Sequence, residues 1–397
     1  MAELIAIDEA RRLVLEEVRP LPAETVRLMD ALGRVLWEEV ASPLDVPPLE
    51  SSAMDGYAVA AGPAGELPVV GESRAGHPFG GALQPGTAIR ISTGAEVPEG
   101  ANAVVPVERT GQASSNGAVE LPDTAAGENV RHAGEDMRAG EVVLRPGTML
   151  GPAEVAVAAS LGRAELSCSK RPRLALVVTG DELAEPGQPL GPGRIYSSNT
   201  WALAGQARAA GAEPKLSETV PDEPGATRAA LERAIEGAEV VCVSGGVSVG
   251  PHDHVKPALE ELGVEERFWG VRLKPGKPTW FGVRDGLLAF GLPGNPVSAM
   301  VTFQLFVRPA LLALQGASPE PRRAEAELAH PVARNERRDQ VLRVRLEETH
   351  GGGRRAALTG GQDSHMLTSM LGADALALIP AGEGELAAGE RVELELL

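Results

Sequence analysis

The chain has 397 residues, a formal net charge of −18 and two cysteines, Cys168 and Cys242. Apolar residues make up 43% of it but aromatic residues only 3%, so we expect aliphatic cores and no base-stacking platform for nucleic acid. The negative charge also opposes attraction to nucleic acid and to anionic membranes. Two isolated cysteines argue against a disulfide framework or a zinc knuckle and indicate a reducing compartment.

Neither the N-terminal segment nor the longest apolar stretch indicates secretion or membrane insertion. Charged residues interrupt the N-terminal segment, which therefore lacks the apolar centre of a signal peptide. The longest apolar stretch, 297–314, contains Gln304, Arg308 and Pro309. We therefore expect a cytoplasmic protein that does not span a membrane.

Taken in chain order, the elements begin with an amphipathic helix. Ile7, Ala10 and Val14 recur at helical spacing after a predicted cap at Asp8. From about residue 43 to 140 the pattern changes to short β-like runs separated by many Gly and Pro residues. We interpret 46–139 as an inserted β-rich domain, flanked by 1–45 and 140–170, which form the N-terminal helix and an elongated linking domain.

Strands and helices alternate between residues 171 and 316. Strands are predicted at 174–178, 240–243 and 287–290, and helices at 200–210, 226–235, 255–262 and from 297 onward. Such alternation predicts a doubly wound, mostly parallel α/β sheet with helices on both faces. A second β-rich segment, 320–397, follows a charged linker, with strands at 341–346, 355–358 and 391–396. The expected fold is multidomain, α/β plus β.

A glycine-rich loop, 244–250, follows the apolar run 240–243. Its glycines remove the Cβ atoms that would keep backbone N–H groups from an anion, and Ser244 and Ser248 add hydroxyl donors. Taken alone, such a loop is more often a turn that ends a strand than a phosphate site.

Two further polar loops follow predicted strands. Residues 179–183 (Thr-Gly-Asp-Glu-Leu) place two carboxylates beside a glycine, and 291–296 lead into a helix whose first N–H groups favour an anion. Ligands in parallel sheets bind at the carboxyl ends of the strands. Three loops that meet at one sheet edge are therefore a stronger indication of a site than any one of them.

Charged residues nearby fit phosphate chemistry. Lys274 and Lys277, on a turn with two prolines, are a candidate clamp for oxyanion oxygens, although an isolated turn of this kind is usually only solvated surface. Asp181, Glu182, Asp222 and Asp253 have the oxygen ligands that Mg²⁺ prefers, but each alone is more often a cap or an exposed carboxylate. In the inserted segment, the turns at 51–58, 91–95 and 134–138 read singly as β-turns.

Together and in order, these segments resemble the molybdopterin molybdenumtransferases, the MoeA family that includes the C-terminal domain of gephyrin. The similar motifs are SAMDGYA at 52–58, ISTGAEVPEGANAVVPVE at 91–108, NVRHAGEDMRAGE at 129–141, TGDEL at 179–183, SGGVSVGPHD at 244–253, LKPGKP at 273–278, LPGNPVSA at 292–299 and the C-terminal DSHMLTSMLGADALALIP. The resemblance covers essentially the whole chain.

The resemblance implies a four-part subunit in a homodimer, with a cleft at the α/β domain completed by the inserted domain of the partner. It implies Mg²⁺-assisted transfer of molybdenum from molybdate to adenylylated molybdopterin, with release of AMP. Implied catalytic residues are Asp55, Thr93, Asp136, Glu182, Asp222 and Asp253, the last three also as metal ligands. Implied substrate-binding residues are Gly180, Asp181, Ser198, Asn199, Ser244, Gly245, Gly246, Ser248, Gly250, Lys274, Lys277, Pro293, Gly294, Asn295, Pro296, Ser298 and Ser364.

Some positions depart from the family pattern or stay open. Asn102 stands where Asp is usual, Val178 stands where Ser commonly precedes TGDEL, and either Arg343 or Arg345 matches a C-terminal arginine. Expected partners are a molybdopterin adenylyltransferase and the proteins that mature molybdoenzymes. Two alternatives remain: an adenylyltransferase, which needs only the α/β unit, and a non-catalytic gephyrin-like scaffold.

Overall fold

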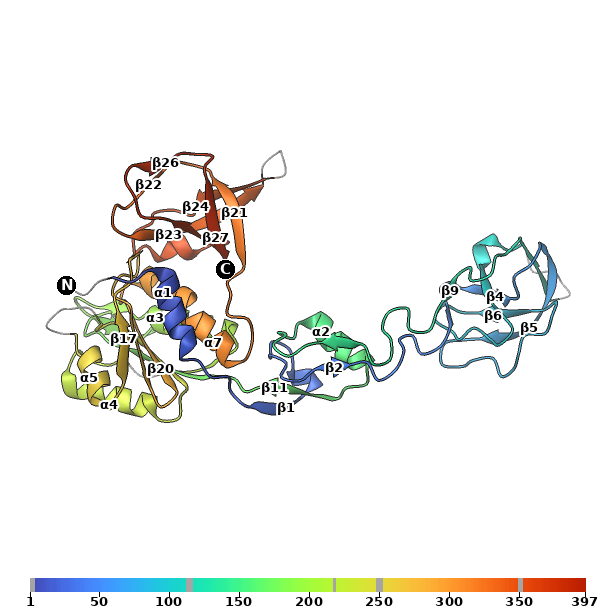
Figure 1. The fold of residues 1–397 in the computed structure, drawn as a ribbon, viewed down its shortest axis with the longest axis horizontal. Helices are drawn as coiled ribbons and strands as arrows, with labels where there is room; N and C mark the ends of the chain where they lie inside the picture. Colours follow the sequence, from blue (N-terminus) through green and yellow to red (C-terminus); the bar gives the residue numbers. More distant parts are fainter. Residues whose placement is uncertain (1–3, 112–116, 217–218, 248–252, 349–352) are drawn as a thin grey trace. The chain divides into compact units, whose positions relative to one another are not determined.

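The computed structural model describes residues 4–111, 117–216, 219–247, 253–348 and 353–397. The chain packs into two compact units. Unit 1 comprises Met1–Trp37, Pro146–Gly151 and Glu165–Leu397, and unit 2 comprises Glu38–Arg145 and Pro152–Ala164. Figure 1 shows the elements of both units, coloured along the sequence.

A six-stranded sheet in the order β15-β12-β16-β20-β19-β17 forms the centre of unit 1. The parallel strands are β12 (Arg173–Val178), β15 (Glu213–Leu216), β16 (Val240–Ser244) and β20 (Leu287–Leu292). The predicted mostly parallel sheet is thus confirmed. Two antiparallel strands that the sequence pattern did not separate, β17 (Glu265–Trp269) and β19 (Trp280–Arg284), complete one side.

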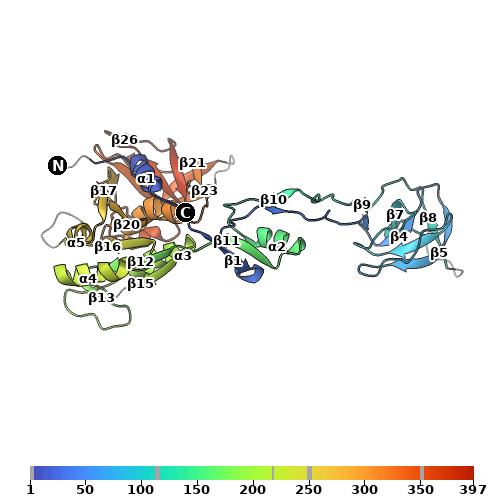
Figure 2. The same ribbon diagram turned by 60° about the horizontal axis from the view of Figure 1, so that its bottom comes forward.

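Helices cover both faces of this sheet (Figures 1 and 2). One face packs against α1 (Ile7–Glu16), α3 (Asn199–Ala209), α6 (Pro296–Thr302) and α7 (Arg308–Leu314), and the other against α4 (Pro224–Ile235) and α5 (Val255–Glu261). The predicted cap at Asp8 is wrong: Ala6 is the N-cap of α1, and Asp8 lies in the first turn, where its charge favours the helix dipole.

The last helical segment of the α/β domain runs from Pro296 to Leu314 and contains a π-helical turn, Phe303–Val307. Pro309 lacks the N–H that would bond to the carbonyl of Leu305. The guanidinium of Arg11 in α1 donates to that carbonyl instead, at 3.1 Å. By length and composition this segment could cross a membrane, but 78% of it is buried, which is typical of a core helix.

The C-terminal part of unit 1 is a closed five-stranded barrel. Its ring is β23-β24-β21-β27-β25, closed by pairing of β25 with β23, and the short strand β18 (Leu273–Lys274) extends it alongside β23. The bounds are β21 (Arg323–Leu328), β23 (Asp339–Glu348), β24 (Arg354–Leu358), β25 (Ala375–Ile379) and β27 (Arg391–Leu396). Buried aliphatic side chains such as Val344, Ala377 and Leu394 fill it. A closed barrel leaves no sheet edge exposed.

Unit 2 contains the predicted β insertion. Its five-stranded sheet, β7-β4-β6-β5-β8, comprises β4 (Gly56–Val59), β5 (Gly65–Ser73), β6 (Ala88–Ile91), β7 (Ala103–Pro106) and β8 (Ala118–Leu121). Small aliphatic cores cover its two faces. Elsewhere in the same unit, β2 (Val40–Ala41) pairs with β10 (Val142–Leu144), as expected for segments that flank the insertion. The unit also contains α2 (Pro152–Ser160).

Candidate functional site

Three parallel strands of unit 1 end level with one another at one edge of the sheet. Val178 at the end of β12 is in register with Ser244 of β16, which is in register with Leu292 of β20. The chain continues across this edge, because Thr179 N–H donates to Ser244 O and Gly245 N–H donates to Leu292 O, each at 3.1 Å. Since parallel strands place their carboxyl ends together, the loops that follow them meet at one place.

These loops enclose a cleft of about 350 Å³. Twelve sequence-predicted residues line it: Gly180, Glu182, Ser198, Asn199, Asp222, Ser244, Gly245, Gly246, Asp253, Pro293, Gly294 and Pro296. The first of them, Gly180, and the last, Pro296, are 116 positions apart in the sequence. The geometry therefore supports a single binding site at the edge where the sequence predicted one.

Asn199, the first residue of α3, joins two of these loops. Its side-chain amide donates to Ser244 Oγ at 2.8 Å and to Gly294 O at 2.7 Å. The hydroxyl of Ser244 in turn donates to Pro293 O at 3.2 Å. Because all three groups are bonded within the protein, they hold the glycine-rich loop and the loop before α6 in fixed positions along the cleft wall.

Glycine is required at two positions of the wall. A Cβ on Gly180, whose φ is +153°, would lie 2.6 Å from Glu182 Oε2, so this glycine leaves room for the Glu182 carboxylate. At Gly245, with φ +97°, a Cβ would lie 2.7 Å from the carbonyl oxygen of Thr179. The absence of these side chains also exposes backbone to the cleft.

Glu182, Asp222 and Asp253 line the same cleft. Among the described residues, no three acidic, His or Cys side chains are grouped closely enough to form a ready-made metal cage. Magnesium rarely uses such a cage, because it keeps several waters and binds one or two carboxylates together with substrate phosphates. The oxygen donors present therefore fit Mg²⁺ bound jointly with a phosphate ligand.

Six other predicted residues of unit 1 that the structure describes do not line the cleft. Asp181 accepts the Asp222 N–H at 3.2 Å, so it shapes the neighbouring backbone. Ser298 is buried in α6. Lys274 and Lys277 are exposed, and their turn contributes only the following Pro278 to the wall. Asn295 and Ser364 bond to each other, and Ser248 and Gly250 lie outside the described residues.

Ser364 belongs to a loop of the barrel that forms hydrogen bonds with the start of α6. Asn295 Nδ2 donates to its hydroxyl at 2.8 Å, and the Val297 N–H donates to its carbonyl at 3.1 Å. One N–H at the start of α6, which the sequence suggested for an anion, is therefore already bonded to the barrel loop.

Arg343 and Arg345 have different environments. Arg343 is fully buried and donates to Ser369 Oγ at 3.0 Å and to the carbonyl of Gly361 at 3.3 Å, so it holds the base of the loop that carries Ser364. Burial lowers the pKa of Arg343 to about 10. Arg345 is exposed and pairs with Glu347.

Sequence reasoning missed several wall residues, of which Thr179 is the most informative. Its side chain is buried, and its hydroxyl has no hydrogen-bond partner among the described residues. A buried hydroxyl that is not bonded within the protein is costly unless a ligand or water satisfies it. Other missed wall residues are Leu183, Ile195, Tyr196, Ser197, Val247 and Pro278. The position of Thr179 directly after a parallel strand was the available signal.

Unit 2 carries a second polar group. Asp55 Oδ1 accepts the Thr93 N–H at 2.7 Å and lies 3.1 Å from the Thr93 hydroxyl, which donates to it. Both residues are exposed. Asp136 is also exposed, and its own N–H donates to Val46 O at 3.0 Å. Asn102, a departure from the family pattern, accepts the Ala61 N–H at 2.7 Å, a role that an Asp would also fill.

Family models match almost the entire chain. They are the MoeA N-terminal region (domain I and II) at residues 5–162, the probable molybdopterin binding domain at 175–313 and the MoeA C-terminal region (domain IV) at 325–397. The chain belongs to the MoeA family. The match of the N- and C-terminal regions argues against an adenylyltransferase built from the α/β unit alone.

Full-length MoeA relatives agree with this assignment. The chain is 35% identical to the molybdopterin molybdenumtransferase of Haemophilus influenzae, covering 99% of this chain and 98% of the relative. It is 38% identical to molybdopterin molybdenumtransferase 2 of Mycobacterium tuberculosis, covering 98% of each. The solved structure of a molybdopterin biosynthesis MoeA protein from Pyrococcus horikoshii OT3 superimposes with a TM-score of 0.83 at 30% identity, covering both chains completely. Membership of this family makes the chain a transferase.

Proposed function

We propose that this MoeA-family enzyme inserts molybdenum from molybdate into adenylylated molybdopterin and releases AMP. The observation that carries the proposal is the cleft at the carboxyl edge of the parallel sheet, which Glu182, Asp222 and Asp253 line together with two glycines of a loop that follows a strand. Carboxylates for a cation and exposed backbone for phosphate are the two requirements of an adenylylated, pyrophosphate-bearing substrate.

Different residues of the cleft and its border have different proposed roles. Gly245 and Gly246 leave backbone open to phosphate oxygens, and the Thr179 hydroxyl provides an additional donor. Glu182, Asp222 and Asp253 would hold Mg²⁺, which when bound neutralises charge that develops at phosphorus. Lys274 and Lys277 are exposed cations beside the cleft segment that contains Pro278, and we assign them to molybdate. We expect hydrolysis of the phosphoanhydride without a covalent enzyme intermediate.

AMP release tests this function. Purified protein given adenylylated molybdopterin, molybdate and Mg²⁺ should release AMP, and Glu182→Gln should slow the release at least about a hundredfold, in line with loss of an electrostatic catalytic group. Asp285→Asn, which removes an exposed carboxylate in the turn between β19 and β20, at the opposite end of β20 from the cleft, is the control. ATP-dependent adenylylation of free molybdopterin without a molybdate response would support the alternative adenylyltransferase instead. A wild-type protein that turns over neither substrate but binds a peptide tightly would support the scaffold.

We also propose a cytoplasmic homodimer in which Asp55, Thr93 and Asp136 of the partner subunit complete the cleft. The exposed Asp55–Thr93 pair and the family resemblance support this arrangement. On the same ground we expect a molybdopterin adenylyltransferase and molybdoenzyme maturation proteins as partners.

Subunit complementation tests the shared site. Asp55→Ala and Glu182→Ala proteins, each inactive alone, are unfolded, mixed and refolded together. Random pairing makes about half of the dimers mixed, and each mixed dimer has one intact site, so about a quarter of wild-type AMP release should return. No recovery in a mixture that does form mixed dimers would place both residues in one subunit and contradict the shared site.

A further inference from the structure

One aromatic side chain lines the cleft among the residues that the structure describes. It is Tyr196 of the short strand β14 (Ile195–Tyr196), and it is 46% exposed. Other aromatic residues of the α/β domain are placed differently: Trp280, Phe281 and Phe290 are fully buried in the core. Core packing therefore does not account for the position of the Tyr196 ring at the cleft.

Hydrogen bonds hold this ring in place. The Tyr196 hydroxyl donates to Gln188 O at 2.9 Å. On either side of Tyr196 in the chain, backbone N–H groups bond β14 to the segment that carries Glu182, at 2.8 and 2.9 Å. Since the hydroxyl is bonded within the protein, the part of this side chain that remains for a ligand is the apolar ring.

The cleft has an apolar part as well as the polar part described above. Leu183, Ile195, Val247 and Pro278 line it together with Tyr196, and Ile195 is 57% exposed. Phosphate and Mg²⁺ would account for the glycines and the carboxylates but not for these side chains. A pocket that combines an apolar lining with a few polar groups is typical of a site for a small organic molecule. The ligand should therefore carry an apolar, flat group in addition to its phosphate.

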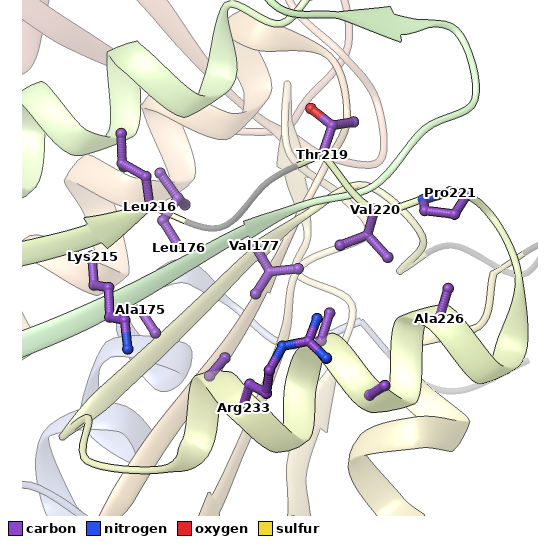
Figure 3. Close-up of a pocket in the computed structure, with 13 residues that line it drawn as sticks. Ala175, Leu176, Val177, Lys215, Leu216, Thr219, Val220, Pro221, Ala226 and Arg233 are labelled. Carbon is purple, nitrogen blue, oxygen red and sulfur yellow. The ribbon is translucent and has the colours of Figure 1, made fainter.

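A larger hollow elsewhere on the sheet differs from the cleft in this respect. It measures about 490 Å³ and is lined by residues of α4 and of nearby strands (Figure 3). None of its described lining residues is aromatic or acidic. Ala175 and Ala230 in its lining belong to the buried core on this face of the sheet. This hollow therefore offers neither a carboxylate for a cation nor an aromatic ring for stacking.

We propose that the ring of Tyr196 stacks against a flat nitrogen heterocycle of the substrate, either its adenine or its pterin, while the attached phosphate lies at Gly245 and Gly246. This role rests on the proposed function, because the substrate assigned there carries both heterocycles on one pyrophosphate. Stacking on an aromatic side chain tolerates different bases, since every base has a π-face. The two heterocycles therefore share the chemistry that Tyr196 would recognise.

Small phosphates with and without a heterocycle test this role by binding, without turnover. AMP, 6-hydroxymethylpterin phosphate and ribose 5-phosphate are each titrated with Mg²⁺ into the full chain and followed by calorimetry. We expect AMP, the pterin phosphate or both to bind at least about fivefold more tightly than ribose 5-phosphate, in line with one stacked base. The ring protons of the stacked heterocycle should shift upfield in ligand-observed NMR, because they lie over an aromatic face.

Three variants separate the ring from other effects. Tyr196→Leu keeps an apolar side chain but removes the ring, so binding of the stacked heterocycle should weaken about fivefold to a hundredfold. Its upfield shift should disappear, and binding of ribose 5-phosphate should be unchanged. Tyr196→Phe retains the ring without the bond to Gln188 and should bind all three phosphates like the wild type. Trp201→Leu, which removes a similarly exposed aromatic residue of α3 that does not line the cleft, is the matched control and should also leave binding unchanged.

The ligand that responds identifies the heterocycle: a loss for AMP alone indicates adenine, and a loss for the pterin phosphate alone indicates pterin. Equal affinity of the wild type and Tyr196→Leu for both heterocyclic phosphates would overturn the stacking role and leave the proposed function intact. An equal loss for ribose 5-phosphate, or an equal loss in Tyr196→Phe, would also overturn it, because the ring itself would not be the cause. If folded wild-type protein bound none of the three phosphates, both the stacking role and the proposed function would be contradicted.

Discussion

The Thr179 hydroxyl is buried in the cleft wall without a partner among the described residues. Thr179→Val replaces it with a methyl group of similar shape. We expect the variant to be as stable as the wild type or more stable by up to about 1 kcal/mol, because an unsatisfied polar group is removed. We expect the KM for adenylylated molybdopterin to rise about tenfold, as for one lost hydrogen bond to a charged group. Thermal unfolding and AMP release measure the two effects.

A matched threonine separates the two effects. The hydroxyl of Thr302 in α6 is also buried, but it donates to Ser298 O at 2.8 Å. Thr302→Val should therefore lower stability by about 1 kcal/mol and leave KM unchanged. If Thr179→Val behaved in the same way as Thr302→Val, the hydroxyl of Thr179 would have no role in binding.

Asn199 gives a second prediction at the scale of one residue. Asn199→Ala removes the two hydrogen bonds by which Asn199 joins Ser244 to the loop at Gly294, so only the longer Ser244–Pro293 bond still connects the two sides of the cleft wall. We expect the rate of AMP release at low substrate concentration to fall about tenfold to a hundredfold, because misplaced groups bind the transition state poorly. Gln206→Ala, which removes one bond to Met300 O elsewhere on α3, should leave that rate within about twofold, as expected for a site remote from the chemistry. Comparable losses in both variants would contradict this assignment.

At the scale of the elements, the sequence predicts the parallel strands and their helices well because their patterns are local. The run Val240–Val243 and the helix at Val255 are signalled by apolar residues within a few positions. The antiparallel strand β17 contains Glu265, Glu266 and Arg267, whose charges mask its role in the sheet. Tyr196 became a wall residue only through contacts between distant segments, which no local pattern carries.

One buried cluster joins three elements that are distant in sequence. Arg11 of α1 lies 2.6 and 2.7 Å from the two carboxylate oxygens of Glu395 in β27, and it also satisfies the carbonyl that Pro309 leaves unbonded. Arg11→Met leaves a buried carboxylate without its cation. We expect the free energy of unfolding to fall by about 3–5 kcal/mol. Denaturant titration followed by tryptophan fluorescence measures it.

Two further variants identify the cause. Arg12→Met removes an exposed guanidinium that pairs with Glu9 and Glu16 one position along α1, and should cost less than about 1 kcal/mol. Arg11→Met combined with Glu395→Met removes both charges and should recover much of the loss. If the double variant is no more stable than Arg11→Met, the loss comes from packing or from the Leu305 carbonyl rather than from the unpaired charge.

At the scale of the whole molecule, the two units have unequal cores. The buried members of the unit 2 cores are aliphatic, whereas those of unit 1 include Phe281, Phe290 and Trp280. Units with separate cores unfold as separate cooperative steps when few contacts join them. Unit 2 should therefore unfold at the lower urea concentration.

The natural probes of the chain distinguish the two steps. All four tryptophans, Trp37, Trp201, Trp269 and Trp280, and both cysteines belong to unit 1. Both thiols are buried, and burial raises the pKa of the Cys242 thiol, so neither should react with a thiol reagent until unit 1 opens. Far-ultraviolet circular dichroism, which detects both units, should begin to change at a lower urea concentration than tryptophan fluorescence and thiol labelling, which should coincide with each other. Superimposed transitions from all three probes would mean that the units unfold together and would contradict the prediction.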